Sequence, residues 1–160
     1  MRGVRRLTMP FVSDKLIEKT WQHVGGFDVK QIRMLQKRNR KAQNALTMFV
    51  YSRIDEFRKD AFGILLYVFH VVIEAFDNAK PRPKRVSKRL IDSVLKDKET
   101  EVHFPIALAM ECSLEPDVLK YVYEAFTEED DVVLSKHELE AFLVALVVVI
   151  ECLHRACLRS

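Results

Sequence analysis

Residues 61–76 read AFGILLYVFHVVIEAF, and as a helix they would be apolar on every side rather than along one stripe. Such a helix is stable in water only when neighbouring elements cover it. Residues 136–158, KHELEAFLVALVVVIECLHRACL, have a similarly broad apolar face. The sequence therefore predicts an all-α, irregular bundle of about six helices with 61–76 and 136–158 packed at its centre. The β-branched and aromatic residues of 61–76 leave a strand as the alternative there.

The composition favours one helical domain. The chain has 160 residues, of which 49% are hydrophobic and 31% are charged, and these values exclude disorder. Four glycines and five prolines are too few for the many turns of a β-sandwich. We expect residues 1–160 to form a single domain with one linker at 80–89, KPRPKRVSKR. Its two prolines oppose a helix, and its like charges favour an extended, solvated chain.

Capping residues predict where the helices begin and end. Ser13 is placed to cap a helix that ends at Gly25-Gly26. The segment 28–79 contains no proline and continues a helical pattern, so it forms one helix or two, with a break expected near 60–63. Further helix starts are predicted at Ser87, Pro105, Pro116 and, through a capping box with Glu138, Ser135.

No targeting signal and no membrane span are expected. The basic start, 1–12, lacks a continuous apolar region. The longest apolar stretches without a charge, 61–73 and 141–150, are shorter than the roughly 18–20 residues of a spanning helix. Cysteines at 112, 152 and 157 are irregularly spaced, which is typical of buried, reduced thiols in a cytosolic protein. We therefore expect a cytoplasmic location.

Charge is distributed unevenly along the chain. Residues 1–89 hold 20 of the 26 Lys and Arg but only 8 of the 23 acidic residues. A basic helix over 30–41, together with the linker 80–89, would match a phosphate backbone, although no known nucleic-acid-binding signature accompanies it. The alternative is that this basic helix faces acidic residues such as 128–131. The candidate nucleic-acid-binding residues are Lys30, Arg33, Lys37, Arg38, Arg40 and Lys41.

Histidines and carboxylates on the apolar helices suggest a metal site. His70 and Glu74 are one helical turn apart, and Glu151 and His154 form an E-x-x-H pair of the kind found in di-iron bundles, with Glu111 as a further ligand. Di-iron bundles use two such pairs and two more glutamates, whereas this chain has one pair. The alternative is a buried His–Glu hydrogen bond without a metal, and we expect no cofactor.

Residues 126–143, FTEEDDVVLSKHELEAFL, resemble a degenerate EF-hand. Counting twelve positions from Thr127 places Glu138 at the twelfth, where a calcium-binding loop has its bidentate glutamate. Thr127 replaces the first-position aspartate, and Val132 replaces the glycine of the sharp turn. A capped helix-loop-helix explains the same residues without an ion.

Enzyme motifs are absent from the sequence: it has no phosphate-binding glycine loop, no nucleophile elbow and no H-E-x-x-H. We therefore expect a non-enzymatic, helical protein-interaction module. The broad apolar face of 136–158 predicts self-association as a homodimer. Nucleic-acid binding through 30–41 and 80–89 is the alternative from a different class, and a metal- or small-ligand-binding bundle is the third.

Overall fold

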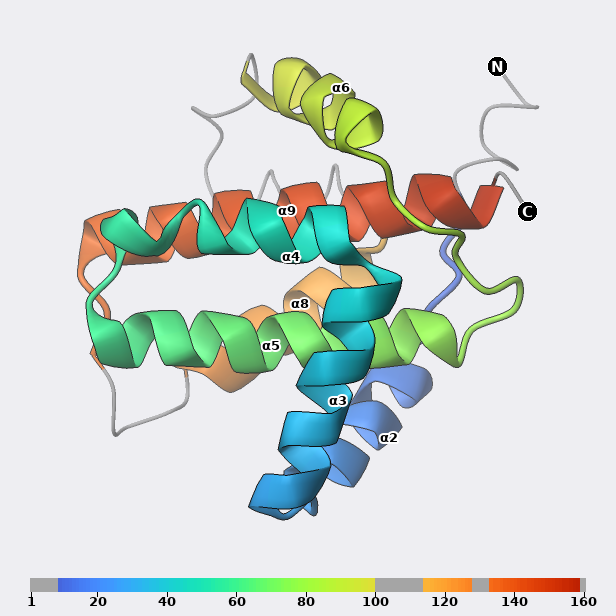
Figure 1. The fold of residues 1–160 in the computed structure, drawn as a ribbon, viewed down its shortest axis with the longest axis horizontal. Coiled ribbons are helices and arrows are strands. Elements are labelled where there is room, and N and C mark those ends of the chain that lie inside the picture. Colours follow the sequence, from blue (N-terminus) through green and yellow to red (C-terminus); the bar gives the residue numbers. More distant parts are fainter. Residues whose placement is uncertain (1–8, 100–113, 128–132, 159–160) are drawn as a thin grey trace.

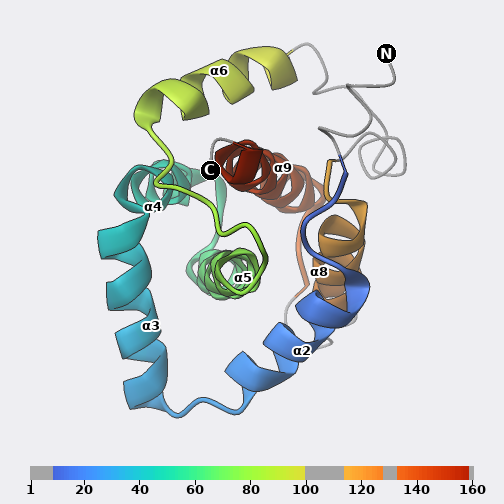
Figure 2. The same cartoon turned by 90° about the vertical axis from the view of Figure 1, so that its right-hand side faces the viewer.

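Two helices lie against each other at the centre of the computed structural model, which describes residues 9–99, 114–127 and 133–158. They are α5 (Lys59–Asp77) and α9 (Lys136–Leu158), seen nearly end-on in Figure 2. Phe69 and Phe76 of α5 are fully buried, as are Phe142 and Leu146 of α9. The two predicted apolar central helices are therefore confirmed, and the described ranges contain no strand.

Five further α-helices and one short 3-10 helix occur in the described ranges, so the bundle has seven α-helices there instead of about six. In Figures 1 and 2, α6 lies on the side of α9 that faces away from α5, while α2 and α3 lie near the other side of α5. The remaining elements, with the labels of Figure 1, are α2 (Asp14–Gly25), α3 (Val29–Ala42), α4 (Asn44–Tyr51), η1 (Ile54–Glu56), α6 (Lys88–Glu99) and α8 (Pro116–Thr127).

The predicted capping residues determine several helix starts. The hydroxyls of Ser13 and Ser87 each accept a hydrogen bond of 3.1 Å from the backbone amide three residues later. Ser135 Oγ accepts from the Glu138 amide at 3.1 Å, and Glu138 Oε1 accepts from the Ser135 amide at 3.0 Å. The predicted starts of α2, α6 and α9 are thus confirmed, and α8 begins at Pro116 as predicted.

The segment 28–79 is interrupted at two places, and the break predicted near 60–63 is too late in the chain. The helical backbone is broken at Gln43, with φ −128° and ψ 58°, and again between α4 and α5. Gly63 lies inside α5. Both breaks are held by distant residues, because Gln43 binds residues 84–86 and the backbone amide of Arg58 binds Glu138. The helix predicted from Pro105 lies outside the described residues.

The linker 80–89 is non-helical up to Ser87, as predicted, but it is not solvated along its whole length. Pro83 and Val86 are buried, and the Lys84 amide donates to the carbonyl of Ala156 on α9 at 3.3 Å. Helix α6 begins at Lys88, inside the predicted linker. Hydrogen bonds from neighbouring elements satisfy the linker backbone and hold the charged segment against the bundle.

Within the described ranges, α9 is the one helix that is long and apolar enough to cross a membrane. Of its apolar window, 78% is buried inside the chain, as in the core helix of a folded domain. Cys152 and Cys157 of this helix are buried, as predicted. Burial raises the pKa of each thiol to about 12, so both are poor nucleophiles. Cys112 lies outside the described residues.

Candidate nucleic-acid interface

Helix α3 presents the six predicted cations to solvent. It contains no acidic residue, and it contacts α4 and α5 rather than the acidic C-terminal helices (Figure 2). Of its cations, Arg38 alone has an ion pair within the described ranges, with Glu74 of α5. Residues 128–131, the acidic neighbours named in the alternative for this helix, lie outside the described ranges, so that alternative stays untested. The exposed set is Lys30, Arg33, Lys37, Arg38, Arg40 and Lys41.

A buried polar pair sets the rotation of α3. Leu35 and Asn39 are the buried residues of this helix. The Asn39 amide nitrogen lies 3.0 Å from His70 Nδ1 on α5. Burial, with a smaller effect of Arg40, lowers the pKa of His70 to about 4, so the imidazole is neutral near pH 7 and its Nδ1 accepts this hydrogen bond. With Leu35 and Asn39 turned inward, the cations are left on the outer face.

Gln43 joins the end of α3 to the linker. Its Oε1 accepts from the Val86 amide at 2.9 Å, and its Nε2 donates to the Lys84 carbonyl at 3.2 Å. In addition, Arg85 Nη2 donates to the carbonyl of Lys41 at 3.4 Å. Two basic segments that lie far apart in the sequence thereby become neighbours.

We call the exposed cations of α3 and of residues 84–89 the basic surface. Apart from the Arg38–Glu74 pair, none of them forms an ion pair inside the described part of the chain. Arg82, which precedes these residues in the linker, pairs with Asp77. The basic surface consists of Lys30, Arg33, Lys37, Arg38, Arg40, Lys41, Lys84, Arg85, Lys88 and Arg89.

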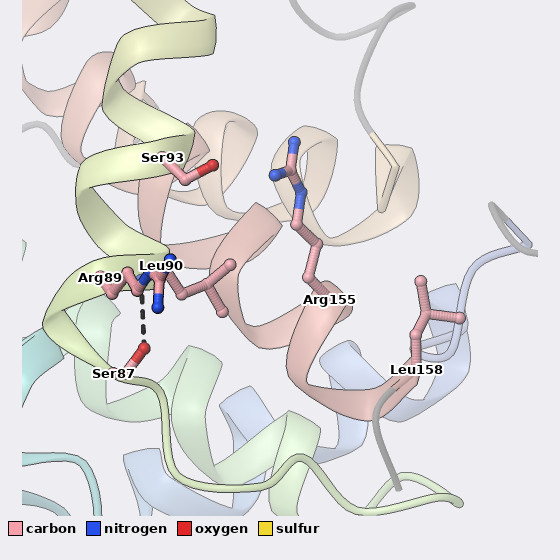
Figure 3. A pocket seen from close by; sticks show the side chains of 6 residues that line it. All are labelled: Ser87, Arg89, Leu90, Ser93, Arg155 and Leu158. Carbon is pink, nitrogen blue, oxygen red and sulfur yellow. Dashed lines mark hydrogen bonds between the residues drawn. The ribbon is translucent and has the colours of Figure 1, made fainter.

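A hollow of about 360 Å³ borders the basic surface between α6 and α9 (Figure 3). It shares Arg89 with that surface, and Arg155 of α9 lines its other side. Sequence reasoning missed Arg155, because its proximity to Arg89 arises only when α6 packs on α9. The hollow is lined by Ser87, Arg89, Leu90, Ser93, Arg155 and Leu158.

The proposed metal ligands do not come together in the described ranges. No group of three or more His, Cys, Asp or Glu side chains that could hold an ion occurs there. Glu111 lies outside those ranges. Each of the other four has a different partner: His70 contacts Asn39, Glu74 contacts Arg38, Glu151 contacts Arg155, and His154 contacts Glu115.

The buried partner of His154 is Glu115, a residue that sequence reasoning did not select. Glu115 Oε2 lies 2.6 Å from His154 Nδ1, and both side chains are fully buried. The carboxylate also accepts from the backbone amides of Phe11 at 2.7 Å and Val12 at 2.9 Å. The pair thus connects three places in the chain: the segment before α2, the start of α8 and the last turns of α9. In the sequence, the position of Glu115 before Pro116 indicates a helix boundary, but it does not indicate that the carboxylate is buried.

The EF-hand-like segment 126–143 is flanked by α8 and α9, but residues 128–132 at its centre lie outside the described ranges. Its twelfth-position residue, Glu138, is bound by Ser135 and by the side chain and backbone of Arg58. These contacts correspond to the helix-capping role that the sequence offered as the alternative to calcium binding.

Comparison of the chain with protein-family models, with curated proteins and with solved structures finds no match. Function therefore has to be inferred from the surfaces and hollows of this chain itself. The basic surface, the hollow between α6 and α9 and an apolar groove between α4 and α6 are features of the described ranges that could receive a partner.

Proposed function

We propose that this protein binds the phosphate backbone of a nucleic acid through the basic surface. The observation that carries the proposal is the hydrogen bonding of Gln43 to Lys84 and Val86, which holds the linker cations beside those of α3. A charged segment that is fixed in place loses less conformational entropy on binding than a free one. Two cationic elements held together therefore favour binding more than either element alone.

The expected binding is electrostatic and depends little on base sequence. Cations that lack an internal partner release the counterions of the phosphates that they contact. If about six phosphates are neutralised, the logarithm of the binding constant for duplex DNA falls with the logarithm of salt concentration with a slope of about −5. No element of the described ranges has a known signature for reading base edges, so we propose a backbone contact alone.

Charge reversal tests the proposal with a closely matched control. Lys37→Glu/Lys41→Glu places two acids on the basic surface, whereas Lys15→Glu/Lys19→Glu makes the same change at the same spacing on the exposed face of α2. Fluorescence anisotropy with generic duplex DNA and RNA at low salt gives the affinities. We expect the α3 variant to lose about a hundredfold in affinity and the α2 variant to lose far less.

Two outcomes would contradict nucleic-acid binding through this surface. The first is an absence of binding by the wild-type protein at low salt. The second is an equal loss in both variants, which would mean that net charge rather than the basic surface determines the affinity. Circular dichroism of both variants serves as the folding control.

Protein binding is a second candidate, favoured by an apolar groove of about 450 Å³ between α4 and α6. Met48, Phe49, Ile91 and Leu95 line it, and Met48 is 61% exposed. Methionine adapts to varied apolar partners, so such a groove suits the apolar face of a helix. Because neighbouring helices cover most of α9, the groove replaces α9 as the surface on which we propose homodimer formation.

Sedimentation over a range of concentrations tests self-association through the groove. We expect wild-type dimers and a monomeric Met48→Glu variant, because a buried unpaired carboxylate opposes the contact. Met34→Glu, which changes an equally exposed methionine on α3, is the control and should still dimerise. A monomeric wild-type protein at the highest concentration would exclude the homodimer.

A further inference from the structure

Two arginines from different helices line the hollow between α6 and α9. Arg89 belongs to the first turn of α6, and Arg155 to the last turns of α9 (Figure 3). Arg89 has no ion pair within the described ranges. Guanidinium groups present several N–H donors in one plane, an arrangement that matches the oxygens of a phosphate. The hollow thus has cationic donors on two of its sides.

Ser87, which caps α6, and Ser93 within α6 add neutral donors to the same hollow. Ser87 Oγ accepts from the Leu90 amide at 3.1 Å, so its hydroxyl proton is still available to donate to a ligand. The Ser93 hydroxyl points towards the side of Arg155 (Figure 3) and has no hydrogen-bond partner in the described ranges. Arginine and serine donors together favour an anion with several oxygens over a carboxylate.

Existing contacts of Arg155 orient its guanidinium without blocking it. Its Nη2 lies 3.0 Å from Asp97 Oδ2 and 3.8 Å from Glu151 Oε1. The side chain of Glu151 is 11% exposed and that of Asp97 is 54% exposed. An ion pair as exposed as that with Asp97 contributes little, so a phosphate can replace that carboxylate at small cost. The buried Glu151 keeps the arginine directed along this side of α9.

We infer that this hollow binds a phosphate monoester, as either the terminal phosphate of a nucleic-acid strand or the phosphate of a free mononucleotide. A monoester carries about −1.5 to −2 charges at pH 7, whereas each phosphodiester of a strand carries one. Two arginines therefore favour a strand end over the strand interior. Leu90 and Leu158 provide an apolar wall for the adjoining sugar or base. The strand-end form of this inference rests on the proposed function, because the hollow borders the basic surface.

Oligonucleotides that differ only in their terminal phosphate test the inference. Anisotropy compares one internally labelled single strand with a 5′-phosphate, with a 3′-phosphate and with hydroxyls at both ends. We expect the wild-type protein to prefer one phosphorylated strand by about tenfold, which is close to the lower value for a single charge-assisted hydrogen bond. Ser93→Glu introduces a repelling charge and should abolish the preference. Gln22→Glu adds the same charge at an exposed position of α2 and should preserve it.

Failure of the pocket and failure of the basic surface give different results. Equal binding of all three strands contradicts phosphate binding in the hollow but does not contradict nucleic-acid binding through the basic surface. A preference that persists in Ser93→Glu has the same meaning. If neither these strands nor duplex DNA binds, the proposed function fails. A titration with adenosine 5′-monophosphate, monitored by NMR, then tests the pocket alone. Amide shifts at Arg89 and Ser93 that disappear in Ser93→Glu support it, and their absence in the wild-type protein overturns it.

Discussion

Glu138 Oε2 lies 2.9 Å from the backbone nitrogen of Arg58, so a side chain at the start of α9 caps the start of α5. The same carboxylate accepts from the Ser135 amide, which completes the capping box of its own helix. One buried carboxylate therefore satisfies amides at the N-termini of both central helices. These contacts set the relative position of the two helices that form the core.

Glu138→Gln should destabilise the fold by about 1–3 kcal/mol. The carboxylate accepts hydrogen bonds from the Arg58 amide, the Arg58 side chain and the Ser135 amide, and a neutral amide is a weaker acceptor for these donors. Urea unfolding measures the change, with the exposed neighbour Glu140→Gln as the control. Hydrogen bonds from the backbones of Arg58 and Ser135 lower the pKa of Glu138 to about 2. The contribution of Glu138 to the free energy of unfolding is therefore complete above pH 4.5, its pKa in the unfolded chain, and it disappears as the pH falls towards 2. Equal stability of the two variants would contradict the double cap.

His70 should make the fold less stable in weak acid. Burial lowers its pKa from 6.5 to about 4, so the unfolded chain binds a proton between these values and the folded chain does not. The free energy of unfolding therefore rises from pH 4 to pH 6.5, by up to about 3 kcal/mol from this residue, and the contribution is constant above that range. His70→Gln should flatten this part of the profile, whereas the exposed His137→Gln should not. Parallel profiles for all three proteins would contradict the shifted pKa.

Gln43→Ala should release the linker from the end of α3. The variant leaves the buried Val86 amide without its acceptor, which costs about 1–3 kcal/mol. Amide hydrogen exchange at Val86 should accelerate, and affinity for duplex DNA should fall severalfold although no charge has changed. Gln22→Ala, on the exposed face of α2, is the control for both measurements. Unchanged exchange at Val86 would show that the linker is held by other contacts.

The charge of the basic surface could be predicted from the sequence, but its continuity could not. The exposed face of α3 followed from the helical spacing of its lysines and arginines, which depends on neighbours within two turns. The approach of Lys84 and Arg85 to that helix depends on Gln43, which lies 43 residues from Val86 in the chain. Similarly, Glu151 and His154 were expected to share a site, whereas Glu151 pairs with Arg155 of its own helix and His154 pairs with Glu115, which lies 39 residues away in the chain.

The sequence by itself determined the apolar central helices and the starts of α2, α6, α8 and α9, because apolar periodicity and capping groups act over a few residues. The tertiary structure alone decided the breaks at Gln43 and before α5, the burial of Glu115 and the neighbouring positions of Arg89 and Arg155. Each of these depends on hydrogen bonds or packing between residues distant in the chain. A local pattern does not encode such contacts, because their partners become neighbours only when the helices have packed.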